Sequence, residues 1–384
     1  MGRAPRDVTV AVIIPTYCRA RLITQSVDSI LGQTRAPDEV IVVDDGSTDD
    51  TVATIARYDG RVRYLYQENA GKPAAVNLAL SQATADYIWV MDDDDVAAAD
   101  ALERHLVFLR RNPGVDFTYS GLYAFDGSKP PPPPEQCRLW QYPDVPRDRF
   151  LIHVMEHAQP NHQTMLVPRR CYEAVGPLKE NLTFCEDYDI VLRLARRYVG
   201  ARLDRPTIFY REHPGGRGPA RERYAASERK RGWLIYEKKI FTELYASLPL
   251  DEYLPRRQAG HSLTPSEKRL ALLQRACIMA HHGVYEAALD DLEAAIGSTG
   301  DAYTLEEQAM CRRMMTLNPL LTGRQAFTRS AARLLRERAP VLFAAIAKGY
   351  LWRSRRSFSS GDFRGAIGAG VQLLRLAGTR ARQA

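Results

Sequence analysis

Residues 87–95 of the chain read Tyr-Ile-Trp-Val-Met-Asp-Asp-Asp-Asp. Five apolar or aromatic residues in an unbroken run predict a strand buried on both faces, as in a parallel sheet. Four adjacent aspartates follow that strand directly. Because open α/β sheets bind ligands at the carboxyl ends of their strands, the stretch predicts such a sheet with an acidic binding loop at 92–95.

The sequence before this stretch alternates between the periods of strands and helices. Apolar runs predict strands at 8–14, 39–43 and 62–66, and helical spacing predicts helices at 22–33 and 73–83, with another helix ending at residue 58. Ser47 or Asp49 is expected to cap that helix, and Pro73 to occupy the first position of the next. The alternation predicts an α/β fold with a mostly parallel sheet and helices on both faces.

Beyond residue 98 the pattern loosens. We expect helices at 99–111 and 186–198, strands at 117–124, 162–167 and 207–210, and an extended surface loop at the five prolines 130–134. No strand pattern follows residue 220, so a first domain at 1–220 and an all-α domain at 221–384 are predicted. Segments 280–288 and 359–366 resemble tetratricopeptide-type turns, but their separation is no multiple of 34 residues, so repeats stay an open alternative.

Composition narrows the class of protein. The chain has 384 residues, 45% hydrophobic and 26% charged, which excludes wholesale disorder, a collagen-like repeat and a multi-span membrane protein. The apolar run after the polar N-terminus is too short for a signal peptide, and Lys348 interrupts the late apolar run 341–352. The six cysteines are scattered without a CxxC pair, as expected of reduced thiols in a cytoplasmic protein.

The net charge of +7 is unevenly distributed. Residues 301–384 contain 15 Lys and Arg against 5 Asp and Glu, so the rest of the chain is slightly acidic. This basic tail fits peripheral contact with an anionic membrane at its inner face, and a solvated helical surface is the alternative. No nucleic-acid-binding motif is present, so no nucleic-acid partner is expected. The basic residues near Trp352 are Arg333, Arg336, Arg338, Lys348, Arg353, Arg355 and Arg356.

Acidic residues at strand ends carry the candidate chemistry. Side chains two apart in an extended segment point the same way, so Asp92 and Asp94 can converge on one divalent cation, Mn²⁺ or Mg²⁺. Asp44 and Asp45 follow an earlier strand and could bond a ribose or a base edge. In both places the alternative is a polar turn that caps the next helix.

Five segments, taken together, resemble family 2 glycosyltransferases, which have the GT-A fold. They occur in the family's order within residues 8–215, and the departure is Cys18, where the family usually has Asn. The resemblance implies a GT-A type, Rossmann-like sheet and inverting transfer of a sugar from a nucleotide-diphosphate sugar; transfer of a single sugar is expected because the sequence shows no membrane spans of a processive synthase. The segments are Val12-Ile-Ile-Pro-Thr-Tyr-Cys-Arg19, Val42-Val-Asp-Asp-Gly-Ser-Thr-Asp49, Glu68-Asn-Ala-Gly71 with Asn77, Met91-Asp-Asp-Asp-Asp95 and Cys185-Glu-Asp-Tyr-Asp189.

The resemblance also implies roles for individual residues. Asp92 and Asp94 match the family's DxD pair, which contacts the ribose and holds the metal on the diphosphate, and Asp95 could share that task. Asp187 matches the catalytic base, with Glu186 beside it in the acceptor site. Asp189 is a lesser candidate for the base. The nucleotide-sugar contacts are expected from Pro15, Thr16 and Tyr17 under the base, from Asp45 bonded to the base, and from Arg19 and Asp93. Lys72, beside Gly71 at a helix start, either contacts a phosphate of the nucleotide sugar or is a surface charge.

Other polar residues are more open. His213 follows the last predicted strand and is a candidate metal ligand, or else a solvated loop histidine. Arg211 or Arg217 is expected to add positive charge near the diphosphate. His162 and Gln163 either border the acceptor cleft or are buried polar groups with partners.

The expected substrates follow the same resemblance. A UDP-sugar is the favoured donor, and the acceptor is expected to be lipid-linked or a glycan, in polysaccharide, cell-envelope or glycoconjugate biosynthesis. A sugar-phosphate nucleotidylyltransferase would begin with a Gly-rich loop, and a processive synthase would have membrane spans. The competing function is a helical scaffold built on a transferase domain that has lost its activity.

Overall fold

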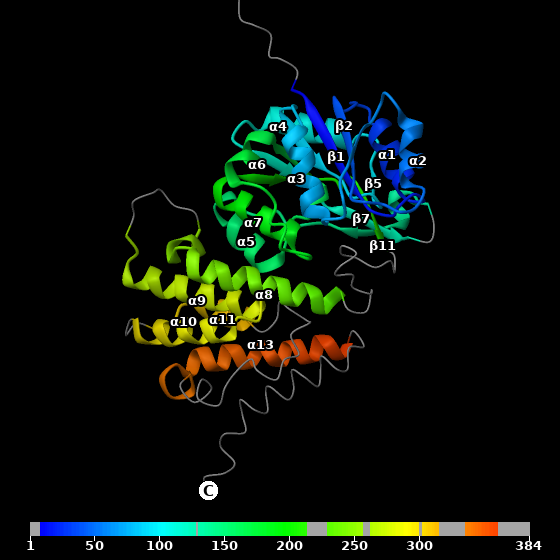
Figure 1. The fold of residues 1–384 in the computed structure, drawn as a ribbon. Helices are drawn as coiled ribbons and strands as arrows, with labels where there is room; N and C mark the ends of the chain where they lie inside the picture. Colours follow the sequence, from blue (N-terminus) through cyan, green and yellow to red (C-terminus); the bar gives the residue numbers. More distant parts are fainter. Residues whose placement is uncertain are drawn as a thin grey trace, which may run out of the picture. The chain divides into compact units, whose positions relative to one another are not determined.

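The computed structural model of the protein describes residues 8–127, 130–212, 229–255, 262–298, 302–314 and 335–359. The chain divides into two compact units (Figure 1), the first made of residues 1–154 and 158–229 and the second of residues 155–157 and 230–384. Several predictions fall outside the described residues. They concern His213, Arg217, Arg333, the side chain of Arg353 and the second repeat-like segment from residue 360 on.

A seven-stranded sheet forms the main layer of the first unit. Its strands, in spatial order, are β10 (Gly200–Arg202), β6 (Phe117–Tyr119), β9 (Met165–Pro168), β4 (Tyr87–Val90), β1 (Val10–Thr16), β2 (Glu39–Asp44) and β3 (Arg63–Tyr66). The pairs β1–β2, β1–β4, β2–β3 and β10–β6 are parallel, and β9 runs antiparallel to β4 and β6. The parallel-rich α/β class expected from the apolar runs is confirmed.

The single strand predicted at 117–124 is two strands in the structure, because its second half belongs to a smaller sheet. That segment splits into β6 and β7 (Leu122–Asp126), and β7 belongs to the small sheet. At the break lies Gly121, where a Cβ would come within 2.6 Å of the Trp140 carbonyl oxygen. The small sheet runs, in order, β5 (Val96–Ala97), β11 (Ile208–Glu212), β7 and β8 (Arg138–Trp140).

Helices surround the main sheet and close its core. In α1, Ile23, Val27 and Ile30 repeat at helical spacing and are fully buried against the interior residues of β1 and β4. The helices up to residue 197 are α1 (Ile23–Leu31), α2 (Thr51–Ile55), α3 (Lys72–Gln82), α4 (Ala101–Arg111), α5 (Phe150–His157), α6 (Arg169–Val175) and α7 (Glu186–Arg197); the last three residues of α5 belong to the second unit.

The structure also corrects the predicted starts of several elements. Helix α2 follows Asp50 without a side-chain cap, because the Ser47 hydroxyl accepts the Cys18 N–H at 2.8 Å and the Asp49 carboxylate accepts the Thr51 N–H at 3.1 Å. Pro73 takes the second position of α3, after Lys72. The proline run is extended up to residue 133 and then enters the 3₁₀ turn 134–136, and residues 162–164 form a 3₁₀ turn before β9 begins.

The described part of the second unit is helical. A turn at 282–284, with Gly283 at φ 75°, joins α9 to α10. Thr264 and Thr304 each form a capping box with a glutamate three residues on, at the starts of α9 and α11. The helices are α8 (Arg229–Ser247), α9 (Pro265–His281), α10 (Tyr285–Ser298), α11 (Leu305–Arg313) and α13 (Pro340–Ser359).

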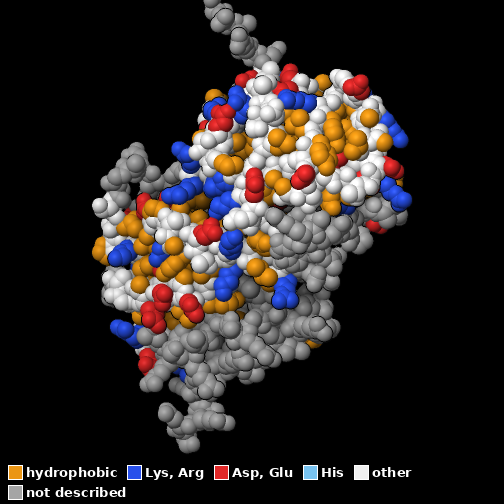
Figure 2. Space-filling view, in the orientation of Figure 1, with side chains coloured by type: hydrophobic (Ala, Val, Ile, Leu, Met, Phe, Trp, Pro, Cys, Tyr) orange, Lys and Arg blue, Asp and Glu red, His pale blue; other side chains and the backbone are white. Residues whose placement is uncertain are grey.

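Two surface properties bear on the expected membrane contact. Among the described helices, none combines the length and apolarity that crossing a bilayer requires. Within each unit, on the face that Figure 2 shows, the visible Lys and Arg side chains lie among apolar and acidic ones.

Candidate active site

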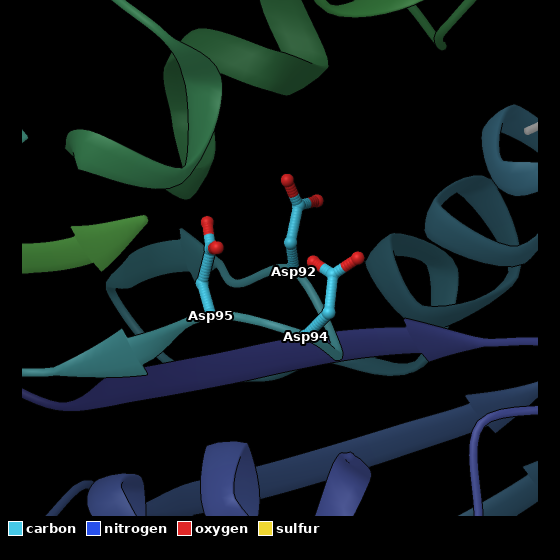
Figure 3. A group of neighbouring side chains, drawn as sticks. All are labelled: Asp92, Asp94 and Asp95. Carbon is cyan, nitrogen blue, oxygen red and sulfur yellow. The ribbon is translucent and has the colours of Figure 1, made fainter. Parts of the chain in front are cut away.

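Three carboxylates converge in the loop after β4. Asp92, Asp94 and Asp95 each offer an oxygen, and these oxygens lie within 4.8 Å of one another. Figure 3 shows the three side chains leaving the loop on the same side. Asp94 and Asp95 are buried and Asp92 is half-buried. We call these residues the acidic triad; it contains the predicted Asp92–Asp94 pair, and its hard oxygen donors suit Mn²⁺ or Mg²⁺.

Bonds from β11 and from the turn before β9 fix the buried end of the acidic triad. Asp95 accepts the Arg211 backbone N–H at 2.9 Å and the Gln163 side-chain amide at 3.2 Å. The Arg211 guanidinium donates to the Asp94 carbonyl oxygen at 2.7 Å and lies over the Phe125 ring. Burial raises the pKa of Asp95 well above its usual value, and the charge of Asp94 adds to the shift. Arg211, expected near the diphosphate, is thus buried and committed to the loop.

Asp93 has a different set of partners, at the end of β1 and on the loop after it. Its carboxylate accepts the Thr16 hydroxyl at 2.7 Å. The Arg19 guanidinium lies 3.9 Å from Asp93 and 3.7 Å from Asp94. Burial and the neighbouring Asp94 charge raise the pKa of Asp93 to about 7. Thr16, Arg19 and Asp93, which the sequence assigned to nucleotide-sugar contact, are therefore brought together; Pro15 precedes them inside β1 and Tyr17 is half-buried beside them.

Asp45 is fully engaged within the chain. One carboxylate oxygen accepts the Gln67 amide at 2.6 Å and the Ala70 N–H at 2.8 Å. The other accepts the Asn69 amide at 3.0 Å and the Gly71 N–H at 2.8 Å. A carboxylate has about four acceptor positions, so all of them hold the loop 67–71. The expected bond from Asp45 to a nucleotide base would require one of these four bonds to break.

The loop held by Asp45 delivers Lys72 to two acidic groups. The Lys72 ammonium donates to Asp92 at 2.6 Å and lies 3.8 Å from Glu186. Glu186 is the first residue of α7 and is 9% exposed. Burial and the adjacent Asp187 charge raise the pKa of Glu186 to about 7, against the opposing effect of Lys72. Lys72 therefore connects Glu186, one of the predicted acceptor-site residues, to Asp92 of the acidic triad.

The remaining carboxylates of α7 have unequal surroundings. Asp187 accepts the backbone N–H of Tyr188 at 2.8 Å. Asp189 is buried and paired with Lys179 at 2.9 Å and with Arg193 at 2.8 Å. These two ion pairs tie Asp189 to its own surroundings and leave it a structural residue of the helix.

The turn before β9 brings in residues that the sequence left open. Gln163 bonds the acidic triad through Asp95, and its carbonyl oxygen accepts the buried Trp89 indole N–H at 2.8 Å. His162 is buried, and its Nε2 lies 2.7 Å from the Tyr172 hydroxyl. Burial lowers the pKa of His162 to about 3, so the ring is neutral. No sequence pattern marked Gln163 as a partner of Asp95, because the contact joins segments that are distant along the chain.

Charge in the site is incompletely balanced. Asp92–Asp95 provide four carboxylates, and the cations beside them are Arg19, Lys72 and the buried Arg211. Like charges so close together are costly unless they are protonated or compensated. A divalent cation would supply the missing positive charge.

Known proteins share this part of the chain. Residues 11–165 match the family model described as Glycosyl transferase family 2. Over 108 residues the chain is 39% identical to an uncharacterized glycosyltransferase of Rickettsia felis, a match that covers 28% of this chain and 18% of that protein. Over 190 residues it is 32% identical to the chondroitin synthase of Pasteurella multocida, covering 48% of this chain and 19% of that protein. The chain thus spans less than a fifth of the length of either relative.

A solved structure supports the fold. TarS of S. aureus, residues 1–349 in complex with UDP-GlcNAc, is similar with a TM-score of 0.51 at 18% identity, over 92% of each chain. The family match spans β1 to β4, the acidic triad and the start of β9. Residues 11–165, which include β1, β2, β4 and the acidic loop at the end of β4, thus match glycosyltransferase family 2, and the solved structure supports a GT-A type sheet.

Proposed function

We propose that this chain is an inverting glycosyltransferase that moves one sugar from a nucleotide-diphosphate sugar to an acceptor hydroxyl. One observation carries the proposal: Lys72 lies within ion-pair distance of both Asp92 and Glu186. A candidate cation site and a pair of carboxylates able to take a proton are therefore neighbours. Such a pairing suits single displacement at an anomeric carbon.

In this mechanism the chain's own residues position the reactants and move one proton. Asp187 takes the proton of the acceptor hydroxyl while that oxygen attacks the anomeric carbon and the bond to the diphosphate oxygen breaks. Attack from the face opposite the leaving group inverts the configuration. Glu186 borders the acceptor, and Asp189 is no base because both of its ion pairs would have to break.

A divalent ion fits the acidic triad. Asp92, Asp94 and Asp95 would hold it, and bound there it would stabilise the negative charge that builds up on the leaving diphosphate. Thr16, Arg19 and the loop 67–71 would contact the nucleotide, with Asp45 acting through that loop. His213 remains a proposed further ligand.

Donor turnover tests the proposal. The full chain is incubated with UDP-, GDP- and dTDP-sugars, with Mn²⁺ or Mg²⁺ and with acceptor extracts, and release of the nucleotide is measured. We expect turnover with one donor class, UDP-sugars first, and its loss on chelation. No turnover with any donor would favour the alternative function, an inactive helical scaffold.

A substitution tests the base. Asp187→Asn should lower the rate of transfer by about a hundredfold or more, the usual contribution of a general base, with nucleotide affinity little changed. Asp204→Asn is the matched control, since Asp204 is 92% exposed. Near wild-type transfer by Asp187→Asn would show that Asp187 is not the base.

The acceptor side of the proposal rests on relatives and on one helix. The chondroitin synthase match supports polysaccharide or glycoconjugate synthesis, with a glycan or lipid-linked acceptor. Helix α13 contains no Asp or Glu and exposes Leu351, Trp352 and Phe358 beside basic residues, with Arg356 over the Trp352 ring. We propose that this helix contacts anionic lipid.

A separate proposal concerns α9 and α10. We propose that these two helices form a tetratricopeptide-like hairpin.

Vesicle binding tests the lipid contact. The protein should sediment with phosphatidylcholine vesicles that contain phosphatidylglycerol, and much less with phosphatidylcholine alone or at high salt. A double change of Arg355 and Arg356 to Glu should abolish sedimentation. Equal sedimentation of that variant would leave α13 as a solvated surface.

A further inference from the structure

Lys72 occupies an unusual place for a surface lysine. It is the first residue of α3 and follows Gly71, whose φ of 100° turns the chain into the helix. Its ammonium lies 2.6 Å from one Asp92 oxygen and 3.8 Å from one Glu186 oxygen. Burial alone would lower the pKa of Lys72, but the charges of Asp92, Glu186 and Asp187 raise it above its usual value. Lys72 is therefore a permanent positive charge shared between two acidic groups.

One of those groups is also part of the acidic triad. Asp92 contributes an oxygen to the group that could hold a divalent ion. An ion there and the ammonium of Lys72 would share one carboxylate, and like charges at such separations repel strongly in a partly buried site. Glu186 is already within ion-pair distance, so the ammonium has a second carboxylate to pair with when Asp92 is taken.

We propose that Lys72 is an exchangeable counter-ion, which neutralises Asp92 while the acidic triad is metal-free and pairs with Glu186 when a divalent ion binds. This inference rests on the proposed function, because it requires the acidic triad to bind such an ion. It differs from the phosphate contact expected from the sequence, since it assigns the ammonium to two carboxylates of the chain. Binding of the divalent ion would then move the ammonium of Lys72 toward Glu186, the residue next to the proposed base Asp187.

Manganese affinity measures the competition without any sugar present. Mn²⁺ alone is titrated into the full chain by calorimetry, and free Mn²⁺ is followed by electron paramagnetic resonance. Lys72→Met should bind Mn²⁺ at least tenfold more tightly than the wild type, because no ammonium has to leave Asp92. Lys179→Met is the matched control: Lys179 pairs with Asp189, away from the acidic triad, and its loss should change the affinity less than twofold.

A double-mutant cycle tests the exchange to Glu186. Glu186→Gln removes the second partner of Lys72 and should weaken Mn²⁺ binding about fivefold in the wild-type background. In the Lys72→Met background the same change should have less than a twofold effect. An equal effect in both backgrounds would mean that Glu186 acts only through its own charge, and the exchange would be refuted.

The outcomes separate this inference from the proposed function. Lys72→Gln is made beside Lys72→Met, so that the competition can still be measured if one variant fails to fold, as judged by thermal unfolding. If the wild type binds Mn²⁺ and both folded Lys72 variants bind it with the same or a lower affinity, the counter-ion role of Lys72 is refuted. The proposed transferase function is then unaffected. Wild-type protein that binds no Mn²⁺ overturns both the counter-ion and the metal site of the proposed function.

Discussion

Replacing Asp45 with asparagine should release the loop 67–71 from the end of β2. The carboxylate accepts four hydrogen bonds from that loop, two on each oxygen, at 2.6–3.0 Å. An asparagine keeps one oxygen and turns the other into an NH₂ group, which cannot accept. Two bonds to a charged acceptor are lost, at about 1.5 kcal/mol or more each, so ordering of the loop should weaken by about 3 kcal/mol.

Hydrogen exchange at two backbone amides reports this change directly. The amides of Ala70 and Gly71 donate to Asp45, and their protection should fall on the order of a hundredfold in Asp45→Asn, since each 1.4 kcal/mol is a factor of ten. Nucleotide affinity should fall together with protection, because the loop 67–71 is itself a proposed nucleotide contact. The exposed Asp204→Asn should change neither quantity.

One result would refute this reasoning. If Asp45→Asn kept wild-type protection at both amides but lost nucleotide binding, the loop would not depend on the carboxylate. Asp45 would then act on the base directly, as the sequence resemblance implies. Separating the two roles requires both measurements on the same preparation.

Three further predictions concern stability. Arg269→Met should destabilise the second unit by about 3–5 kcal/mol in chemical denaturation, because the buried Glu307 carboxylate, 2.6 Å from Arg269, would lose its ion-pair partner. A loss below about 1 kcal/mol would show that water reaches the pair. Burial lowers the pKa of His105 to about 3. As the pH falls below 6.5, His105 therefore binds a proton in the unfolded chain but not in the folded chain, which lowers the free energy of unfolding by about 2 kcal/mol at pH 5. His105→Gln should remove this loss from the pH profile of stability. Gly121→Ala should cost about 1–3 kcal/mol because its Cβ meets the Trp140 carbonyl at 2.6 Å, and an unchanged melting temperature would mean that β8 can shift.

Strands with continuous apolar runs could be predicted from the sequence, and short strands at the edges of the sheets could not. The runs of β1, β2 and β4 bury both faces in a parallel sheet, so their composition alone identifies them. Strand β8 has three residues that are all exposed, and β5 has only two residues, so neither carries a period. Their pairing depends on β7 and β11, which tertiary contacts bring beside them.

The candidate site divides in the same way. Asp92 and Asp94 could be paired from sequence because both lie in one loop, where spacing along the chain sets direction. The bonds of Asp45 to the loop 67–71 and of Lys72 to Asp92 join segments 20 or more residues apart. Sequence patterns carry no information on such pairs in a single chain, so the partners of Asp45 and Lys72 within the chain could not be predicted, and their contacts with substrate stay predictions.

These internal bonds change how donor binding should be pictured. Thr16 bonds Asp93, Asp45 holds the loop 67–71 and Lys72 pairs with Asp92, so the site is arranged before any ligand arrives. Arrangement in advance reduces the ordering cost of binding, but each group that then contacts a ligand must give up a bond to its present partner. Binding at this site is therefore an exchange of partners, and Lys72 already has a second carboxylate, Glu186, within ion-pair distance for that exchange.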